Sequence, residues 1–267
     1  MTAGASAPVL LDAQGITKRF GGVHALADVD FQIREREIYG LIGPNGAGKT
    51  TLFNVLTGIY APDAGRFEFD GRPIGGLKPN EVAARGIART FQNIRLFANL
   101  SALENVMIGR HVRTHAGVVG AILRDRRTRE EERAIEKHAY ELLAFVGVHR
   151  RANDLARHLA YGDQRRLEIA RALATEPRLL ALDEPAAGMN KTEKASLRTL
   201  LEQIRATGTT ILLIEHDMKL VMSVCDRVLV LDYGRKIAEG PAAQVQHDEK
   251  VIAAYLGGEI ALTRRTA

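Results

Sequence analysis

The sequence predicts an α/β fold with a parallel sheet at its centre, and three observations support this. From residue 178 onward, short apolar runs alternate with helical segments, which is typical of parallel strands covered on both faces. Residues 9–71 contain short segments rich in β-forming residues and separated by turns, which indicates an additional β region. Residues 93–160 are mostly helical in pattern. We therefore expect a helical subdomain inserted into an α/β core.

The individual elements follow from periodicity and turn signals. Ser101 followed three residues later by Glu104 is a capping-box pattern, which starts a helix over 101–112. Apolar residues at three- and four-residue steps predict a longer helix over 126–146. The predicted strands are 9–20, 24–33, 37–43, 66–71, 178–184, 209–217 and 227–234, and the later helices are 191–206 and 218–226.

Composition is that of an ordinary globular protein, with 26% charged and 46% hydrophobic residues. The net charge of +5 favours anionic partners in general, such as nucleotides, phospholipid head groups or nucleic acid. No apolar run reaches the length of a bilayer-spanning helix, and residues 1–10 lack the basic start and apolar centre of a secretory signal. We expect a cytosolic chain in which the single cysteine, Cys225, is a buried small hydrophobe.

The stretch GPNGAGKT, residues 43–50, matches the complete phosphate-binding pattern G-x-x-x-x-G-K-[ST]. An apolar strand precedes it and a helical segment follows it, so loop amides and a helix N-terminus can surround phosphate oxygens. Lys49 is expected to reach the β- and γ-phosphates, and the Thr50 hydroxyl to ligate Mg²⁺. The expected nucleotide contacts are Gly43, Pro44, Asn45, Gly46, Ala47, Gly48, Lys49, Thr50 and Thr51.

Two acids end the apolar strand LLALDE. Asp183 comes at the carboxyl end, where open α/β sheets bind ligands, and is expected to hold Mg²⁺ through a water molecule. Glu184 follows directly and is expected to polarise an attacking water as general base. His216 in LLIEHD and Gln92 in RTFQNIRLF are weaker candidates by themselves, because both residue types are common in structural roles.

The stretch LAYGDQRRLEIARAL, residues 159–173, predicts an amphipathic helix. Asp163 is expected to be its N-cap, with Gly162 in the turn that leads into it. Free N–H groups at such a helix start can be completed by a ligand.

These stretches, with LLALDEPAAG and LLIEH, have the order and approximate spacing of the nucleotide-binding subunit of ABC transporters, and the resemblance covers residues 9–256. It implies a P-loop NTPase (RecA-like) parallel-sheet core with an N-terminal antiparallel β-subdomain and an inserted α-helical subdomain. The core would then comprise 1–92 and 161–240, the helical subdomain 93–160, and a C-terminal helix and tail 241–267. The resemblance also implies an ATPase that uses ATP and Mg²⁺.

The resemblance assigns further roles residue by residue. Gln92 resembles the glutamine that contacts Mg²⁺ or water and links the core to the helical subdomain, and His216 resembles the histidine that contacts the γ-phosphate. Phe20, in ITKRFGG, resembles the aromatic residue that stacks on adenine. The implied catalytic residues are Lys49, Gln92, Glu184 and His216, and the implied metal ligands are Thr50, Gln92 and Asp183.

Residues 160–163 resemble the signature loop, which is expected to contact ATP held by a second cassette, identical or paralogous, in a head-to-tail dimer. AAGMN, 186–190, resembles the loop along that interface. The chain departs from the commonest pattern at four positions, where Ala160 replaces serine, Tyr161 replaces glycine, Asp163 replaces glutamine and Asn190 replaces aspartate. We expect Asp163 to turn inward and cap its own helix, away from phosphate. We expect turnover to survive, because the catalytic lysine, both acids and the histidine are present.

Within the family, DEPAAGMN, LLIEHDMKLVM and VIAAYLGGE are among the stretches that resemble the LivG-type subunit of branched-chain amino acid importers. This implies two integral membrane permeases, indirectly a solute-binding protein, and a peripheral position on the cytoplasmic face of the inner membrane. Related urea and amide importers use very similar cassettes and are an alternative. A soluble ABC ATPase acting on nucleic acid or the ribosome has support only from the basic run 124–129, which we interpret as a solvated helix face, so no nucleic-acid partner is expected. A third class, a GTPase or a small-molecule kinase, is also weighed, and a guanine-reading Asn-Lys-x-Asp is missing, since NKTE ends in Glu193.

Overall fold

The computed structural model describes residues 7–110 and 126–255, and only the backbone of 126–129. The chain divides into two compact units, Met1–Arg85 with Ala181–Ala267 as the first and Gly86–Leu180 as the second. Each unit has its own buried core and its own candidate functional residues. Among the helices described in these ranges, none combines the length and hydropathy of a membrane-spanning segment.

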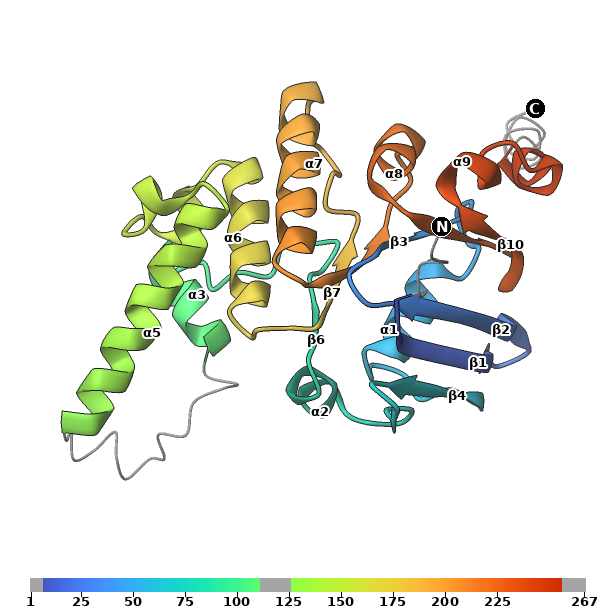
Figure 1. The fold of residues 1–267 in the computed structure, drawn as a ribbon, viewed down its shortest axis with the longest axis horizontal. Helices are drawn as coiled ribbons and strands as arrows, with labels where there is room; N and C mark the ends of the chain where they lie inside the picture. The colour runs from blue at the N-terminus through green and yellow to red at the C-terminus, as the bar shows by residue number, and fades with distance from the viewer. Residues whose placement is uncertain (1–6, 111–125, 256–267) are drawn as a thin grey trace, which may run out of the picture. The chain divides into compact units, whose positions relative to one another are not determined.

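The first unit contains an antiparallel sheet, whose strands β1, β2 and β4 run side by side in Figure 1. Leu11 of β1 pairs with Ile33 of β2 on one side and Phe69 of β4 on the other, and all three are buried. Because side chains alternate across a strand, this register directs one apolar face into the core. The strands are β1 (Val9–Phe20), β2 (Val23–Arg34), β4 (Ala64–Phe69) and β5 (Arg72–Pro73), in the order β2-β1-β4-β5.

The first unit also contains the predicted parallel strands. β3 (Ile38–Ile42) pairs in parallel with β8 (Thr210–Ile214) on one side and β9 (Arg227–Asp232) on the other. Every residue of β3 and β8 is buried, as expected for central strands covered on both faces. The order is β10-β9-β3-β8-β7, with β10 (Arg235–Pro241) antiparallel to β9, and β7 (Leu179–Asp183) bringing its last residues into this unit. These strands confirm the predicted fold class.

The helices of the first unit bury apolar faces. Leu197, Leu201 and Ile204 of α7 recur at helical spacing and are buried. A Cβ on Gly40 of β3 would lie 3.0 Å from Cys225 Sγ at the end of α8, so glycine permits this close approach. Cys225 is buried as predicted, and burial raises its thiol pKa. These helices are α1 (Lys49–Leu56), α2 (Pro79–Ala84), α7 (Lys191–Ala206), α8 (Met218–Val224) and α9 (Ala242–Val245), and residues 249–255 are also helical.

The second unit is mainly helical. The predicted capping box is present, because Ser101 Oγ accepts from the Glu104 amide at 3.2 Å and the Glu104 carboxylate accepts from the Ser101 amide at 2.7 Å. Gly109 of α3 permits close helix packing, since a Cβ there would lie 2.3 Å from the Arg171 carbonyl of α6. The elements are β6 (Ile87–Arg89), α3 (Ala102–Arg110), α5 (Arg126–Phe145), the 3-10 turns His149–Arg151 and Ala156–His158, and α6 (Tyr161–Leu173).

Some elements differ from the sequence predictions. The strand expected over 209–217 ends at Ile214, so that His216 lies beyond the sheet. β10 and β6 were not predicted: β10 is half-buried and polar, and β6 has only three residues. The basic run 124–129 has no described side chains, and its interpretation as a solvated face lies outside the described residues.

Candidate nucleotide-binding site

The glycine-rich loop follows β3 directly, and its backbone requires glycine. Gly43 has φ of +149°, and a Cβ there would lie 2.1 Å from the Leu231 carbonyl. Gly48 has φ of +100°, and a Cβ there would lie 2.6 Å from the Ala25 carbonyl. Gly48 is also the N-cap of α1 and offers no side-chain hydrogen bond. The first amides of α1 therefore lack a side-chain cap, which is the arrangement that binds phosphate at a helix N-terminus.

Lys49 is the first residue of α1 and is buried. Its Nζ donates to the Gly43 carbonyl at 2.7 Å and to the Pro44 carbonyl at 3.0 Å, so the side chain folds back along the loop. Burial lowers the pKa of Lys49, and attraction to Glu184 and then Asp183 partly offsets this effect. The ammonium group thus lies within the electrostatic field of both acids. Thr50 is exposed beside it, and Thr51 is half-buried.

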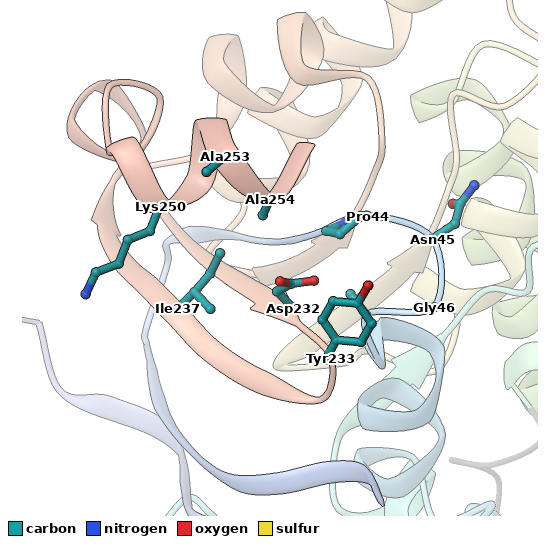
Figure 2. Close-up of a pocket in the computed structure, with 10 residues that line it drawn as sticks. Pro44, Asn45, Gly46, Asp232, Tyr233, Ile237, Lys250, Ala253 and Ala254 are labelled. Carbon is teal, nitrogen blue, oxygen red and sulfur yellow. The ribbon is translucent and has the colours of Figure 1, made fainter. Parts of the chain in front are cut away.

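The turn between β9 and β10 is hydrogen-bonded to the glycine-rich loop. The Gly234 amide donates to the Ala47 carbonyl at 2.9 Å, and the Gly234 carbonyl accepts from the Ala27 amide at 2.8 Å. A cavity of about 510 Å³ lies beside the same loop. Figure 2 shows Asp232 and Tyr233 beneath the loop and Ala253 and Ala254 on the nearby helix. The residues that line it are Pro44, Asn45, Gly46, Ala47, Asp232, Tyr233, Ile237, Lys250, Ala253 and Ala254, so the lining does not include Lys49, Asp183 or Glu184.

Asp183 and Glu184 follow each other at the end of β7, and the backbone of Glu184 adopts an unusual conformation. Asp183 is the last strand residue and is only 5% exposed. Glu184 has φ of +46°, in the left-handed region that non-glycine residues rarely adopt, and its amide donates to the Ile214 carbonyl at 2.9 Å. This conformation turns the Glu184 carboxylate toward His216, whose Nδ1 lies 3.6 Å from Glu184 Oε2.

A third acid, Glu215, accepts hydrogen bonds from the backbone amides of Ala186 and His216. Its side chain is fully buried and accepts from the Ala186 amide at 2.7 Å and from the His216 amide at 3.2 Å. Burial raises the pKa of Glu215, although these hydrogen bonds and the nearby imidazole oppose the rise. The His216 side chain remains 61% exposed. Glu215 therefore joins the loop after β8 to the loop after β7.

Asn190 does not serve as a free polar group of the 186–190 loop. It is the N-cap of α7, where its Oδ1 accepts from the Glu193 amide at 3.0 Å and the Glu193 carboxylate accepts from the Asn190 amide at 2.8 Å. Asp217 similarly caps α8 and accepts from Lys194 Nζ at 2.6 Å. The hydrogen bond from Lys194 is the main reason that the Asp217 pKa lies below its ordinary value. The starts of α7 and α8 are thus tied together.

Phe20 lies at the end of β1 and is 44% exposed. Tyr60 packs against it edge to face, with ring centroids 5.2 Å apart. Lys18 Nζ lies 5.6 Å from the Phe20 ring centre. The Tyr60 amide in turn donates to Asn54, a residue of α1. An exposed aromatic surface of this kind can stack on a planar base.

Gln92 and residues 160–163 belong to the second unit. Gln92 is exposed, and its carbonyl accepts a hydrogen bond from Arg165 Nη2. α6 begins at Tyr161, with Ala160 as an N-cap that offers no side-chain hydrogen bond. The expectations that Asp163 is the N-cap of this helix and that Gly162 lies in the turn before it were wrong, because Gly162 and Asp163 are the second and third helical residues. Asp163 still favours the helix electrostatically, because an acid in the first turn complements the helix dipole.

Several predicted residues come together within the first unit. Lys49 lies close enough to Asp183 and Glu184 for both acids to affect its pKa, and Glu184 meets His216. The sequence analysis missed Glu215, although an acid placed directly after a buried strand and before His216 was a visible signal. It also missed Tyr60, which no local pattern distinguishes.

The oxygen donors of Asp183 and Thr50 fit Mg²⁺, an ion that protein side chains need to coordinate only in part. Asp183 supplies a buried carboxylate near Lys49, and Thr50 supplies an exposed hydroxyl at the start of α1. Oxygen donors of this type suit Mg²⁺, which usually completes its shell with phosphate and water. Across the described ranges, no group of three or more His, Cys, Asp or Glu could hold a metal ion.

Comparisons with known proteins agree with this geometry. A family model described as "ABC transporter" matches residues 26–187, and a second, "Branched-chain amino acid ATP-binding cassette transporter", matches residues 235–261. The high-affinity branched-chain amino acid transport ATP-binding protein LivG of Salmonella typhimurium is 45% identical over 249 residues, which are 93% of this chain and 98% of LivG.

Two solved structures are also similar. An ATP-binding cassette of an ABC transporter in its ADP conformation has a TM-score of 0.81 and 32% identity, covering 93% of this chain and 99% of that one. A dimeric ATP-binding cassette in a post-hydrolysis state, bound to ADP and Pi, has a TM-score of 0.74 and 26% identity, covering 87% of this chain and 99% of its own.

Proposed function

Because this chain belongs to the ABC transporter family of ATP-binding cassettes, we propose that it is the ATPase subunit of an importer for branched-chain amino acids. Family membership confirms the resemblance found in the sequence. The substrate class is supported by the 45% identity to LivG over nearly the whole of both chains. The match of residues 235–261 to the branched-chain amino acid cassette model supports it independently.

One observation supports the ATPase assignment above all others. The buried lysine of the glycine-rich loop shares its electrostatic environment with the two acids that end β7, and the second acid faces His216. Hydrolysis of a nucleoside triphosphate requires a cation for the terminal phosphates, a ligand for the metal and a base for the attacking water. Lys49, Asp183 and Glu184 match these three requirements in one unit.

Binding would begin at the loop and α1. The amides that follow Gly43 and the uncapped first turn of α1 donate to phosphate oxygens, and Thr51 lies in the same turn. Lys49 Nζ exchanges its bonds to the Gly43 and Pro44 carbonyls for stronger, charge-assisted bonds to the β- and γ-phosphates. Phe20 stacks on adenine, with Tyr60 holding the phenylalanine ring from its edge.

Thr50 and Asp183 would hold Mg²⁺, which would supply positive charge that neutralises the phosphate oxygens, and the family resemblance gives Gln92 a role in the same hydrolysis. Asp183 suits this role because its buried carboxylate lies at the end of β7, with Lys49 nearby. Glu184 accepts a proton from the attacking water, and His216 orients the Glu184 carboxylate and approaches the γ-phosphate. The hydrogen bond that the Glu184 amide donates to the Ile214 carbonyl, at the end of β8, fixes the backbone from which Glu184 projects.

The chain would act as one half of a pair. The exposed start of α6, at 160–163, offers amide donors without a side-chain cap to ATP bound by a second cassette. A dimeric relative has been solved with ADP and Pi, which supports a dimer of cassettes, and the family resemblance implies its head-to-tail arrangement. Two integral permeases would transmit the closing and opening of this dimer to the solute pathway on the cytoplasmic face of the inner membrane. A solute-binding protein would deliver the amino acid to them.

The decisive experiment is transport by the reconstituted complex. Neighbouring genes should encode two multi-spanning permeases, a second cassette and a secreted binding protein, and these would be assembled with this chain in proteoliposomes. ATP-dependent uptake of leucine, isoleucine and valine is expected, with urea and short amides as the competing substrates. Uptake of urea or amides alone would assign the chain to the related importers. ATP turnover stimulated by nucleic acid and not by the binding protein would contradict an importer role.

A further inference from the structure

Three polar or aromatic side chains lie along one face of α6. Tyr161, Arg165 and Glu168 are spaced by four and three residues, which places them on the same side of a helix. Arg165 Nη2 lies 3.2 Å from the Tyr161 hydroxyl, and its guanidinium lies 5.6 Å from the Tyr161 ring centre. Arg165 Nη1 lies 3.3 Å from Glu168 Oε2. Tyr161 is the residue that replaces the usual glycine of the signature loop.

Arg165 also reaches the segment that contains Gln92. Its Nη1 donates to the Phe91 carbonyl at 2.7 Å, and its Nη2 donates to the Gln92 carbonyl. The rigid fork of a guanidinium can make these two bonds together, whereas a lysine has a single compact ammonium group. The Gln92 backbone is therefore connected through one side chain to the first residue of α6.

Glu168 holds the other side of the same segment. Its Oε1 accepts from the Phe91 amide at 3.4 Å and from the Arg95 amide at 3.3 Å. Arg89 and Arg95 lie 4.5 Å and 4.6 Å from the centre of the Phe91 ring. The carbonyls of this segment are thus bound by Arg165, and its amides by Glu168.

The buried ion pair between Arg165 and Glu168 is not explained by stability alone. Arg165 is 2% exposed and Glu168 is 1% exposed. A buried ion pair gives little net stability compared with apolar residues of the same size, because both charges lose their hydration. The pair instead favours one backbone path for residues 91–95, because other paths would remove hydrogen bonds from these buried charged groups.

We propose that Arg165 is a positioning residue that couples Gln92 to the signature loop, so that the start of α6 and the Gln92 backbone move as one body. Tyr161 completes this link from the exposed end of α6, where ATP of a second cassette is expected to bind. The inference rests on the proposed function, in which Gln92 serves hydrolysis and transport. Contact between the signature loop and nucleotide then changes the position of Gln92 without a separate signal.

The test is a double-mutant cycle in the reconstituted transporter, with substrate-stimulated ATP turnover as the readout. Arg165→Met with Glu168→Met removes both charges together, which avoids a buried unpaired charge that would prevent folding. This pair is combined with Gln92→Ala. The matched control is Arg166→Met, because Arg166 is the next arginine on α6 but donates to Val146 outside the Gln92 segment.

We expect the Arg165/Glu168 pair variant to lower kcat about tenfold and to leave the KM for ATP within about twofold. In the Gln92→Ala background the same substitutions should change kcat by less than about twofold, because the residue they position is already lost. Amide hydrogen exchange at residues 91–95 should accelerate in the pair variant and not in Arg166→Met. These results together support the coupling.

An equal loss of kcat in both backgrounds would show a general structural effect and would overturn the inference. So would unchanged kcat in the pair variant, or normal kcat in Gln92→Ala alone. A separate measurement tests the proposed function: if Glu184→Gln retained ATP turnover, the proposed function would fail, whatever the result for Arg165. Where the pair variant does not fold, Tyr161→Phe removes only the hydroxyl that Arg165 contacts, and accelerated exchange at residues 91–95 is expected there, whereas unchanged exchange contradicts the link.

Discussion

The carboxylate of Glu184 and the imidazole of His216 face each other across 3.6 Å, although the two residues come from loops after different strands. Glu184 projects toward His216 from a left-handed backbone conformation, with φ of +46°. His216 reaches its position because β8 ends two residues earlier and the buried Glu215 binds the His216 amide. Asp183 at the end of β7 and Glu184 directly after it therefore differ in backbone conformation, in keeping with the proposed roles of metal ligand and base.

Glu184→Gln should abolish turnover and preserve ATP binding. The amide keeps the size of the side chain but cannot accept a proton from water, so kcat should fall by about 10²- to 10⁴-fold. Steady-state hydrolysis and equilibrium nucleotide binding measure the two effects, and size-exclusion chromatography should show ATP-dependent dimers. Glu202→Gln, at an exposed acid of α7, is the control and should behave as wild type. Near-normal turnover in Glu184→Gln would contradict the role of base.

Lys49→Ala should lose nucleotide affinity. A charge-assisted hydrogen bond contributes about 1.5–3 kcal/mol, so the Kd for ATP should rise at least tenfold. Isothermal titration with ATP measures this change. Lys191→Ala is a matched control, because Lys191 is also the first residue of a helix but lies exposed on α7. Equal affinities for ATP in wild type and Lys49→Ala would contradict the assignment of the glycine-rich loop to the binding site.

Phe20→Ala should weaken ATP binding through the base. Aromatic stacking contributes about 0.5–1.5 kcal/mol beyond area burial, which corresponds to a two- to twelvefold rise in Kd. Phe20→Trp should retain the affinity, since it preserves a planar ring. Val23→Ala, at an exposed residue of the adjacent hairpin, is the control. If tripolyphosphate binding weakens as much as ATP binding, the effect does not come from adenine.

Asn190→Ala should destabilise the chain by about 0.5–2 kcal/mol, because it removes the N-cap of α7. Asn190→Asp should retain the stability, since a carboxylate accepts the same hydrogen bond from the Glu193 amide. Urea unfolding measures both free energies. A neutral effect of alanine would mean that the capping box contributes nothing to stability.

Glu215→Gln should flatten the pH dependence of stability. Burial raises the pKa of folded Glu215 above its ordinary value of 4.5, so the folded chain retains this proton to higher pH than the unfolded chain. The free energy of unfolding of wild type should therefore fall as pH rises from about 4.5 through the raised pKa. Glutamine does not titrate, and the stability difference between variant and wild type should shift in favour of the variant over this interval.

Urea unfolding from about pH 4 to pH 8 measures this difference. Glu202→Gln is again the control variant, because it removes an acid elsewhere in the first unit. A constant difference for Glu215→Gln would mean that Glu215 titrates as an exposed acid does.

Prediction from sequence was most accurate where local patterns decide the structure. The predicted β1 at 9–20 and α7 at 191–206 match the observed bounds, because turns or caps delimit each of them. β10 was missed because its residues are polar and half-buried, and its pairing with β9 decides its conformation. Asp163 was misplaced by three residues, since α6 begins without a capping side chain and no local signal marks its start.

By itself the sequence determined the α/β class, the glycine-rich loop before α1 and the two acids after β7, since these depend on residue order and short spacing. Only the tertiary structure decided that Glu215 joins two loops and that Arg165 holds the Gln92 backbone. The pairs that meet there are separated by 29 and 73 residues. Their meeting depends on how strands and helices pack, because burial makes a polar partner obligatory without indicating where in the chain it lies.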